Sequence, residues 1–477
     1  MADRPYIFFE LTNALCSRCL RKVEAKVVIR DGRVYMHKFC PEHGAERVLV
    51  STDADYYQFS RRTLKPGQMP LRFHTEIARG CPFDCGLCPD HEQHSCVALV
   101  EVTDHCNLTC PVCYADSSPR REAHRPLEQV EAMLDAVVRS EGNPDVVQIS
   151  GGEPTIHPDF FAILDAAKAR PIKHLMLNTN GIRIAREPGF ARRLADYRRG
   201  FEVYLQFDSL DAGPQKALRG ADLTEVHAGA LDALDEHGIS TTLVVTLKKG
   251  LNDDQVGAIL DFALTRPSVR GVTFQPIQDA GRVEDYDPAR DRLTLSEVRS
   301  RIIEQSPIFG PGDVVPVPCH PDCLAMAYAL KLGGEVVPLT RLLDPTTLLE
   351  LQGNTVLNEQ DPRLRKLAIE LFSTSHSPDS SAWTLRQLLC CLPEFAAPPE
   401  LTYDRVFRIL IVQFMDAYSM DIRSVKKSCL HIVHPDGRLI PFDTYNLFYR
   451  DRAAGAGFAD TPAAPPLVQI GAGGGRP

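Results

Sequence analysis

Residues 106–114 read Cys106-Asn-Leu-Thr-Cys110-Pro-Val-Cys113-Tyr114, directly after an apolar run at 97–102 that is typical of a strand. The cysteine spacing is C-x3-C-x2-C. Three thiolates on one loop can hold three irons of a [4Fe–4S] cluster and leave the fourth iron open. An open coordination position distinguishes a catalytic metal centre from a structural one, and a closed zinc site would need a fourth ligand. The stretch therefore favours a catalytic iron–sulfur site over a zinc knuckle.

A second motif, Ser150-Gly151-Gly152-Glu153-Pro154, follows another apolar run at 146–149. Together and in this order, the two motifs resemble those of the radical S-adenosylmethionine (SAM) enzymes. The resemblance implies that SAM chelates the open iron through its amino and carboxylate groups. It also implies that the Gly-Gly-Glu-Pro turn meets the SAM amino group.

The chain between residues 98 and 285 alternates apolar strand-like runs with amphipathic stretches of helical length, such as 126–140 and 223–237. Nearly continuous apolar runs are typical of a parallel sheet covered by helices. Six such units match the partial (β/α)6 TIM-like barrel of the radical SAM family, with the chemistry at the carboxyl ends of the strands. The expected strands are 97–103, 146–150, 174–179, 202–208, 241–247 and 271–277.

Polar residues at the ends of these strands are the expected SAM contacts by resemblance. Each of them could instead be an ordinary strand-end cap, and the Glu153 carboxylate could stand behind the site rather than in it. Gln275 would face the adenine. The full expected set is Gly151, Gly152, Glu153, Pro154, Asn178, Thr179, Asn180, Gln206, Asp208 and Gln275.

A second C-x3-C-x2-C run, Cys81-Pro-Phe-Asp-Cys85-Gly-Leu-Cys88, is followed by Cys96. Four thiolates close a [4Fe–4S] cluster, so this loop is predicted to hold an auxiliary, electron-carrying or structural centre. His91 and His94 lie in the same loop as alternative ligands, and zinc is the alternative metal.

The N-terminal region carries Cys16-x2-Cys19 and Cys40-x2-His43 around a hairpin signal at Asp31-Gly32. Two such pairs at ribbon spacing are typical of one tetrahedral metal ion. We expect a mononuclear zinc or iron that stabilises a small module with little core.

Five cysteines remain. Cys319 and Cys323 could begin a second auxiliary cluster, completed by Cys429 and by Cys391 or its neighbour Cys390. Cys390 and Cys391 could instead be small core residues on a helix.

The composition limits the partners and the compartment. The chain has 477 residues, 44% of them hydrophobic, and a net charge of −9, which argues against a nucleic-acid partner. No apolar stretch is long enough to span a membrane, and no export signal is visible at the N-terminus. The 15 cysteines fall in clusters, which favours metal binding in a reducing cytoplasm, with peripheral membrane contact left open.

These signals divide the chain into five expected parts. They are a zinc-ribbon or rubredoxin-like module (1–70), an auxiliary iron–sulfur loop (71–97), the radical SAM barrel (98–285), a mostly helical substrate and auxiliary-cluster region (286–450) and a disordered tail (451–477). Within the fourth part, residues 403–450 are expected to contain a helix and then a strand pair turned at 435–437.

The resemblance extends beyond the two core motifs to the subfamily that contains the tetraether lipid synthase and pterin C-methylating enzymes. The segments that carry it are Cys40-Pro-Glu-His-Gly44, Gly80-Cys-Pro-Phe-Asp-Cys-Gly-Leu-Cys-Pro89, Val317-Pro-Cys-His-Pro-Asp-Cys323, Cys429-Leu-His-Ile-Val-His-Pro-Asp-Gly-Arg-Leu-Ile-Pro-Phe442 and Asp443-Thr-Tyr-Asn446.

This resemblance implies hydrogen abstraction by a 5′-deoxyadenosyl radical and C–C bond formation on a lipid alkyl chain. The alternative is radical C-methylation of a pterin-like small molecule. An iron–sulfur scaffold without turnover and peptide modification are less favoured. An electron donor such as a flavodoxin or ferredoxin is an expected partner.

Overall fold

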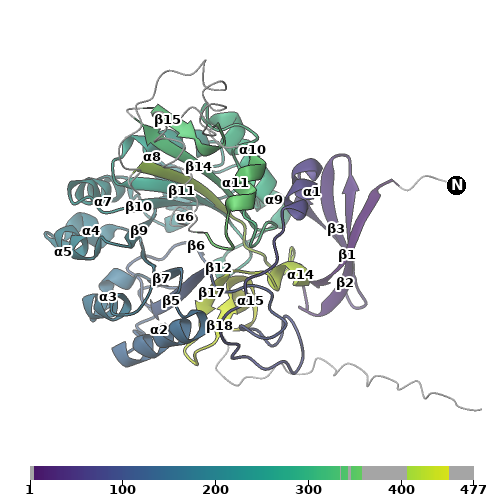
Figure 1. Cartoon of the computed structure of the whole chain (residues 1–477), viewed down its shortest axis with the longest axis horizontal. Coiled ribbons are helices and arrows are strands. Elements are labelled where there is room, and N and C mark those ends of the chain that lie inside the picture. Colours follow the sequence, from purple (N-terminus) through teal and green to yellow (C-terminus); the bar gives the residue numbers. More distant parts are fainter. Residues whose placement is uncertain (1–4, 333–334, 342–344, 357–404, 451–477) are drawn as a thin grey trace, which may run out of the picture.

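The computed structural model describes residues 5–332, 335–341, 345–356 and 405–450. The chain begins with a four-stranded antiparallel sheet made of β1 (Ile7–Leu15), β2 (Lys22–Arg30), β3 (Arg33–Cys40) and β4 (Gly44–Ser51). Asp31 and Gly32 turn β2 into β3 with φ of 52° and 71°, a left-handed conformation that suits this pair of residues. Helix α1 (Ala54–Arg62) follows, and the sheet stands at one side of the larger body (Figure 1).

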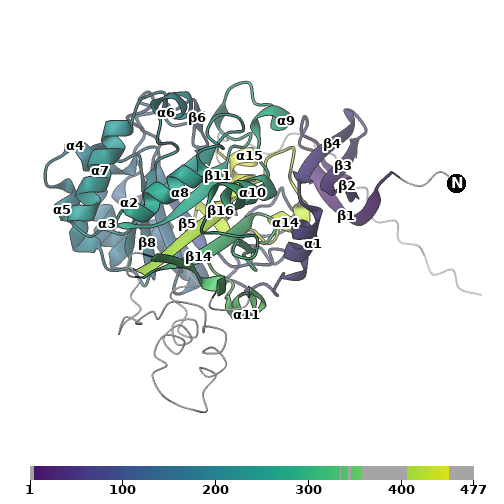
Figure 2. The same ribbon diagram turned by 90° about the horizontal axis from the view of Figure 1, so that it is seen from above.

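The expected partial barrel is confirmed. Six strands run parallel and neighbour one another in chain order: β5 (Val97–Thr103), β7 (Val146–Gly151), β8 (His174–Thr179), β9 (Phe201–Gln206), β10 (Thr241–Leu247) and β11 (Val269–Pro276). The connecting helices, which cover the outer face of the sheet, are α2 (Leu127–Glu141), α3 (Phe160–Lys168), α4 (Ile182–Arg186), α5 (Phe190–Leu194), α6 (Ala212–Arg219), α7 (Thr224–Glu236) and α8 (Val256–Thr265) (Figure 2).

Successive side chains along each strand point alternately to an outer core and to the interior of the barrel. In β7, Val147 and Ile149 pack with Met133 of α2 in the outer core. Gln148, between them, lines a cavity inside the barrel. Because successive side chains of a strand point to opposite faces, one short segment serves both the core and the site.

Strands from the end of the chain extend the parallel sheet at both edges. β16 (Val406–Val412) pairs parallel with β11, and β17 (Leu430–Val433) pairs parallel with β5. β14 (Leu324–Leu332) lies antiparallel to β16, between it and the short β13 (Val315–Pro316), and β15 (Glu335–Pro338) pairs with β14. The barrel wall is thus completed by segments far from the six core units in sequence.

The expectation of a mostly helical region after residue 286 is wrong for much of its described part. Helices α9 (Pro288–Asp291), α10 (Leu295–Gln305) and α11 (Pro345–Leu351) are present, but Val315–Pro316, Leu324–Leu332 and Glu335–Pro338 form strands β13 to β15. The β14 sequence, Leu-Ala-Met-Ala-Tyr-Ala-Leu-Lys-Leu, is rich in helix formers. Its described side chains from Leu324 to Leu330 are all buried, so tertiary packing overrides local propensity.

The last described segment also begins differently from the expectation. Residues 406–412 form strand β16 rather than a helix, and only the short helix α14 (Ile422–Val425) precedes β17. The expected strand pair is present as β17 and β18 (Leu439–Pro441), with Gly437 in the turn at φ 91°, and α15 (Phe442–Phe448) follows. The predictions for Cys390, Cys391 and residues 451–477 fall outside the described residues.

Two basic residues dock the N-terminal sheet onto the rest of the molecule. Arg61 of α1 donates to both carboxylate oxygens of Glu10 at 2.9 Å and to Asp322 at 2.9 and 3.1 Å. The buried Lys38 ammonium donates to the carbonyl oxygens of Leu15 at 2.7 Å, Ala417 at 3.1 Å and Tyr418 at 2.8 Å. These contacts hold the N-terminal module against segments that flank the barrel.

A buried charged group joins four strands inside the barrel. Glu202 of β9 accepts hydrogen bonds from Arg408 of β16 at 2.7 and 2.8 Å, from Thr242 of β10, and lies 3.1 Å from His174 of β8. Burial opposes ionisation of Glu202, but the Arg408 guanidinium and His174 hold its pKa well below the usual range. The added strand β16 is therefore bound electrostatically to the barrel centre.

Replacing Glu202 with Gln should lower the free energy of unfolding by about 3–5 kcal/mol, because it removes the carboxylate charge that pairs with the buried Arg408 guanidinium. Urea denaturation at neutral pH measures the change. The matched control is Glu187→Gln, which removes the partly exposed ion pair with Arg183 and should change stability by less than about 1 kcal/mol. Equal effects of the two substitutions would contradict this role of Glu202.

Candidate functional site

The three cysteines of the first motif lie on the loop after β5 and line one cavity at the carboxyl ends of the strands. Cys106 and Cys110 are buried and Cys113 is half-buried. Cys113 belongs to the short strand β6 (Val112–Cys113), which pairs with β12 (Arg282–Val283). Three sulfurs opening on the same space agree with the expected cluster site.

Arg282 fixes the shape of this loop, and sequence reasoning did not find it. Its guanidinium donates to the Cys110 carbonyl oxygen at 2.7 Å, to the Ser117 carbonyl oxygen at 2.7 Å and to the Asp116 carboxylate at 2.9 Å. Arg282 follows the last barrel strand, and nothing in the neighbouring sequence indicates that its side chain contacts a loop far earlier in the chain.

The thiols of this loop need a positive centre to ionise. Burial raises the pKa of the Cys106 thiol to about 12. Burial also raises the pKa of Cys110, against the nearby charge of Arg219. A metal ion deprotonates a coordinating thiol outright, so an iron centre among the three sulfurs suits this donor set.

The glycine-rich turn packs directly on the cysteine loop. The Gly152 amide donates to the Thr103 carbonyl oxygen at 2.7 Å, and the Glu153 amide donates to the His105 carbonyl oxygen at 2.9 Å. A Cβ atom on Gly151 would lie 2.3 Å from the Thr103 carbonyl oxygen, and one on Gly152 would lie 2.1 Å from that of His105. The two motifs are therefore in backbone contact, which only glycine permits.

The Glu153 carboxylate is engaged inside the protein. It accepts hydrogen bonds from the hydroxyls of Thr155 at 2.6 Å and Thr179 at 2.7 Å and from the backbone amide of Asn180 at 2.8 Å. Burial raises its pKa, and these donors act in the opposite direction. Glu153 joins the turn to the end of β8, which agrees with the alternative that it stands behind the site. Pro154 opens the adjoining 3-10 turn η1 (Pro154–Ile156).

A chain of polar side chains crosses the strand ends inside the cavity. The Tyr114 and Ser150 hydroxyls lie 3.0 Å apart, and the Asn178 amide donates to Ser150 at 3.0 Å. The Gln206 amide donates to Asn178 at 2.7 Å, and Arg219 donates to Gln206 at 2.7 Å. Hydrogen bonds fix the orientation of each member, so the chain presents a preorganised polar surface beside the cysteines.

Asp208 does not line the cavity, in contrast to the expected SAM contact. It is fully buried and accepts hydrogen bonds from Arg219, at 2.8 Å for one carboxylate oxygen, and from the Thr246 amide at 2.8 Å. Its role in the structure is to hold Arg219, which does line the cavity. Arg219 ends α6, where basic residues are common for helix stability alone, so its position gave no functional signal.

Apart from Pro154, which does not line the cavity, the other predicted strand-end residues reach it. Asn180 donates to the Asn107 side chain of the cysteine loop at 2.7 Å, and Gln275 donates to the Tyr204 hydroxyl at 3.1 Å. The predicted residues that line the cavity are Cys106, Cys110, Cys113, Gly151, Gly152, Glu153, Asn178, Thr179, Asn180, Gln206 and Gln275.

The N-terminal donors come together between two turns. The ligand atoms of Cys16, Cys19, Cys40 and His43 lie within 4.8 Å of one another. Desolvation opposes ionisation of Cys40, but hydrogen bonds from the Glu42 and His43 backbone and the His43 ring lower its pKa to about 6. A thiol held as thiolate beside three other donors suits one tetrahedral metal ion.

The remaining cysteines are grouped differently from the expectation. Cys96 lies with Cys319 and Cys429 instead of completing the Cys81, Cys85 and Cys88 loop. The three buried sulfurs lie within 4.8 Å of one another, and those of Cys319 and Cys429 are 3.5 Å apart.

The surroundings of this trio supply one further donor. His94 Nε2 lies 3.6 Å from the Cys96 sulfur, whereas Cys323 faces Ser424 at 4.0 Å. His91 contacts His431 at 3.3 Å and the Ser428 carbonyl oxygen at 2.9 Å. Cysteine spacing could not reveal the trio, because its members come from three separate segments.

None of the helices among the described residues has the length and apolar character needed to cross a membrane.

Comparison with known proteins agrees with this arrangement. Residues 100–263 match the model of the radical SAM superfamily, and residues 8–52 match that of the HMPTM N-terminal zinc ribbon domain. The chain is 28% identical, over 92% of its length and 94% of the relative, to a 7,8-dihydro-6-hydroxymethylpterin dimethyltransferase of Methanocaldococcus jannaschii.

Two further similarities cover less than half of the chain. A GTP 3′,8-cyclase of Alkaliphilus metalliredigens is 29% identical over 44% of this chain and 64% of the relative. A mycofactocin maturase of Mycobacterium tuberculosis is 32% identical over 36% of this chain and 45% of the relative. Residues 100–263, which include most of the barrel, are thus those of a radical SAM domain.

Proposed function

We propose that the chain is a radical SAM enzyme that methylates a carbon atom of a pterin-like small molecule. The C–CH3 bond would form as the S–CH3 bond of a second SAM breaks, and a second electron from the reductant would leave that sulfur as a thioether. When bound, the [4Fe–4S] cluster and SAM take up one electron and supply a 5′-deoxyadenosyl radical that removes hydrogen from a C–H bond. The chain's own residues would bind and orient SAM and substrate and keep water away from the radical.

The observation that carries this proposal is the cavity inside the barrel. Its volume is about 190 Å³, and it would hold the reacting part of a compact molecule beside SAM rather than two extended alkyl chains. Hydrogen-bonding groups at several heights along its wall, from Asn178 and Gln206 at the strand ends to Thr273 and Gln148 deeper inside, suit a heterocycle with many polar edges.

SAM would lie at the strand ends, between the cysteine loop and the chain of polar side chains. The Gly151-Gly152 backbone would meet its methionine part, and Arg219 supplies a fixed positive charge in the cavity close to Cys110. A charged guanidinium is the donor best suited to a carboxylate, which methionine carries. Asn178, Asn180, Gln206 and Gln275 are the proposed contacts for the rest of SAM.

The other cysteine groups are proposed as three separate metal sites. Cys16, Cys19, Cys40 and His43 would hold a mononuclear zinc or iron. Cys96, Cys319 and Cys429 would hold an auxiliary iron–sulfur centre, and His94 Nε2, which lies 3.6 Å from the Cys96 sulfur, also contacts the Asn354 carbonyl oxygen at 2.7 Å. The Cys81, Cys85 and Cys88 loop would hold a further centre, whose fourth ligand is open now that Cys96 is placed elsewhere.

C–C bond formation on a lipid alkyl chain is the second candidate. Apolar side chains along the wall of the cavity favour it, because methylenes pack well against aliphatic walls. They are Val97, Leu99, Leu324, Leu410, Val412 and Leu430. The full-length similarity to a pterin dimethyltransferase supports the small-molecule reading more strongly.

Anaerobically reconstituted protein given SAM, dithionite and 7,8-dihydro-6-hydroxymethylpterin should form 5′-deoxyadenosine and a methylated pterin. Mass spectrometry of the reaction measures both. Cys113→Ala should abolish both products, because two thiolates do not hold the cluster with its open iron. Formation of 5′-deoxyadenosine with an unchanged pterin, and coupled alkyl chains in lipid extracts of expressing cells, would favour the lipid candidate.

The grouping of the auxiliary cysteines can be tested by counting iron. Cys96→Ala, Cys319→Ala and the double variant should each lose the same iron, about four atoms for one [4Fe–4S] centre. Cys96→Ala combined with Cys81→Ala should lose about twice as much, because the two residues serve different sites. Mössbauer spectra and iron analysis give the counts. A loss of about four irons from Cys96→Ala/Cys81→Ala, with about eight from Cys96→Ala/Cys319→Ala, would return Cys96 to the Cys81 loop.

A further inference from the structure

One face of the N-terminal sheet carries an exposed row of apolar and basic side chains. Register places Leu11 of β1 opposite Lys26 of β2, Lys26 opposite His37 of β3, and His37 opposite Arg47 of β4. The alternate row, which includes Val27, Met36 and Val48, is buried, so the first row faces outward. Leu11 is 73% exposed, and Phe39, on the same groove, is 62% exposed.

This face is locally positive on an acidic chain. The basic residues on the groove outnumber its two carboxylates, Glu24 and Glu46, and Glu46 pairs with Lys38 at 3.2 Å, while the whole chain has a net charge of −9. The basic residues are Arg21, Lys22, Lys26, Lys38 and Arg47. Lys26 contacts the Tyr6 hydroxyl at 2.9 Å, and Arg47 lies over the Tyr35 ring at 5.3 Å. Because these partners are neutral, the two positive charges remain available to a partner.

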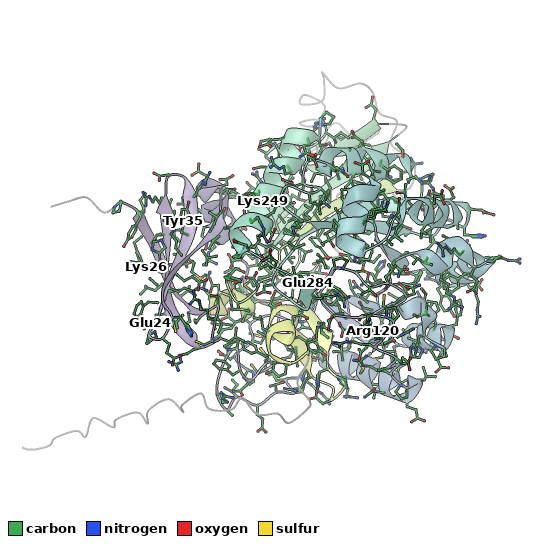
Figure 3. The ribbon with its side chains drawn as sticks, turned by 180° about the vertical axis from the view of Figure 1, so that it is seen from behind. Glu24, Lys26, Tyr35, Arg120, Lys249 and Glu284 are labelled. Carbon is green, nitrogen blue, oxygen red and sulfur yellow. The ribbon has the colours of Figure 1, made fainter. Side chains whose placement is uncertain are left out.

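The pKa of His37 reflects the positive charge of this face. Partial burial lowers its pKa first, and the charges of Lys26 and Arg47 lower it further. Figure 3 shows Glu24, Lys26 and Tyr35 together on the strands of this module, at the side of the molecule away from the barrel helices. We call Leu11, Lys22, Lys26, Phe39 and Arg47 the basic–apolar face.

The basic–apolar face adjoins two of the cysteine groups. Lys22 begins β2 shortly after Cys19, and its ammonium lies 3.4 Å from the Cys81 carbonyl oxygen. Pro41, on the same groove, lies between Cys40 and His43 in the chain. A partner seated on this face would therefore stand beside the proposed ribbon metal and beside the Cys81 loop.

We propose that an acidic one-electron carrier protein, of the flavodoxin or ferredoxin class, docks on the basic–apolar face. The inference rests on the proposed function, because each SAM cleaved to methionine and a 5′-deoxyadenosyl radical takes up one electron from outside the chain. The electron leaves the reduced flavin or iron–sulfur group of the partner, which is thereby oxidised by one electron.

Charge complementarity is the basis for choosing this occupant. Opposite charges steer a transient redox encounter and raise its association rate, and such encounters bury little surface. A nucleic acid is disfavoured by the acidic chain as a whole. An anionic membrane would also meet basic and apolar side chains, but it would not need to lie beside cysteine groups.

The test compares charge reversal on this face with charge reversal at the far side of the molecule. The variant is Lys26→Glu/Arg47→Glu. Its control is Arg192→Glu/Arg198→Glu, two exposed residues in and just after α5, which lies across the molecule from the N-terminal sheet (Figure 1). The rate of 5′-deoxyadenosine formation is measured against the concentration of a bacterial flavodoxin kept reduced by its reductase, and separately with dithionite.

The face variant should raise the KM for flavodoxin by about tenfold at low salt, because favourable charge pairs become repulsive. The wild type and the control should keep a low KM that rises with ionic strength. All three should form 5′-deoxyadenosine equally with dithionite, which needs no docking surface, and should melt at the same temperature. Leu11→Ser should weaken flavodoxin binding without changing its salt dependence.

An unchanged KM in the face variant would overturn the docking proposal. The proposal would also be overturned if the face variant bound phosphatidylserine vesicles more weakly than the wild type while its KM for flavodoxin stayed normal. That result would assign the face to a membrane. Failure of all proteins to form 5′-deoxyadenosine with dithionite would count against the proposed function instead. Calorimetric titration with flavodoxin would then still measure the docking, with binding expected for the control and lost in the face variant.

Discussion

The site depends on one close backbone contact, between the Gly151-Gly152 turn after β7 and the first residues of the cysteine loop after β5. The turn donates both hydrogen bonds, from the Gly152 and Glu153 amides to carbonyl oxygens at 2.7 and 2.9 Å, and a Cβ on Gly152 would lie 2.1 Å from a carbonyl oxygen. This contact sets the cysteine loop over the strand ends. Because parallel neighbouring strands end at the same edge, the polar groups of β8 and β9 fall beside it.

Electrostatics then determines what the cavity can hold. Burying a charged group costs free energy unless an opposite charge lies beside it. The groups concerned are the cysteine thiolates, the Arg219 guanidinium and the Glu202–Arg408 pair. Asp208 matches Arg219, Glu202 matches Arg408, and the cysteine sulfurs need a metal centre. The site is therefore a set of paired charges inside an apolar barrel, which suits chemistry that must exclude water.

The local sequence pattern predicted the features that depend on neighbouring residues. The six parallel strands, the hairpin at Asp31-Gly32 and the two core motifs follow from apolar runs, turn residues and spacing. The missed features bring together residues distant in sequence: Arg282 on the Cys110 loop, β16 from beyond residue 400 beside β11, and Cys96 beside Cys319 and Cys429. The β14 strand was missed because burial, rather than propensity, makes it a strand.

The most direct test of the account is the electron paramagnetic resonance spectrum of the reduced, reconstituted protein before and after SAM is added. If Cys106, Cys110 and Cys113 hold a cluster with one open iron, SAM should change the signal of one cluster and leave the auxiliary signals unaltered. SAM labelled with nitrogen-15 in the amino group of its methionine part should show coupling to that cluster. Cys113→Ala should lose both the change in the signal and this coupling. A spectrum that SAM does not alter, with all clusters assembled, would contradict the central claim.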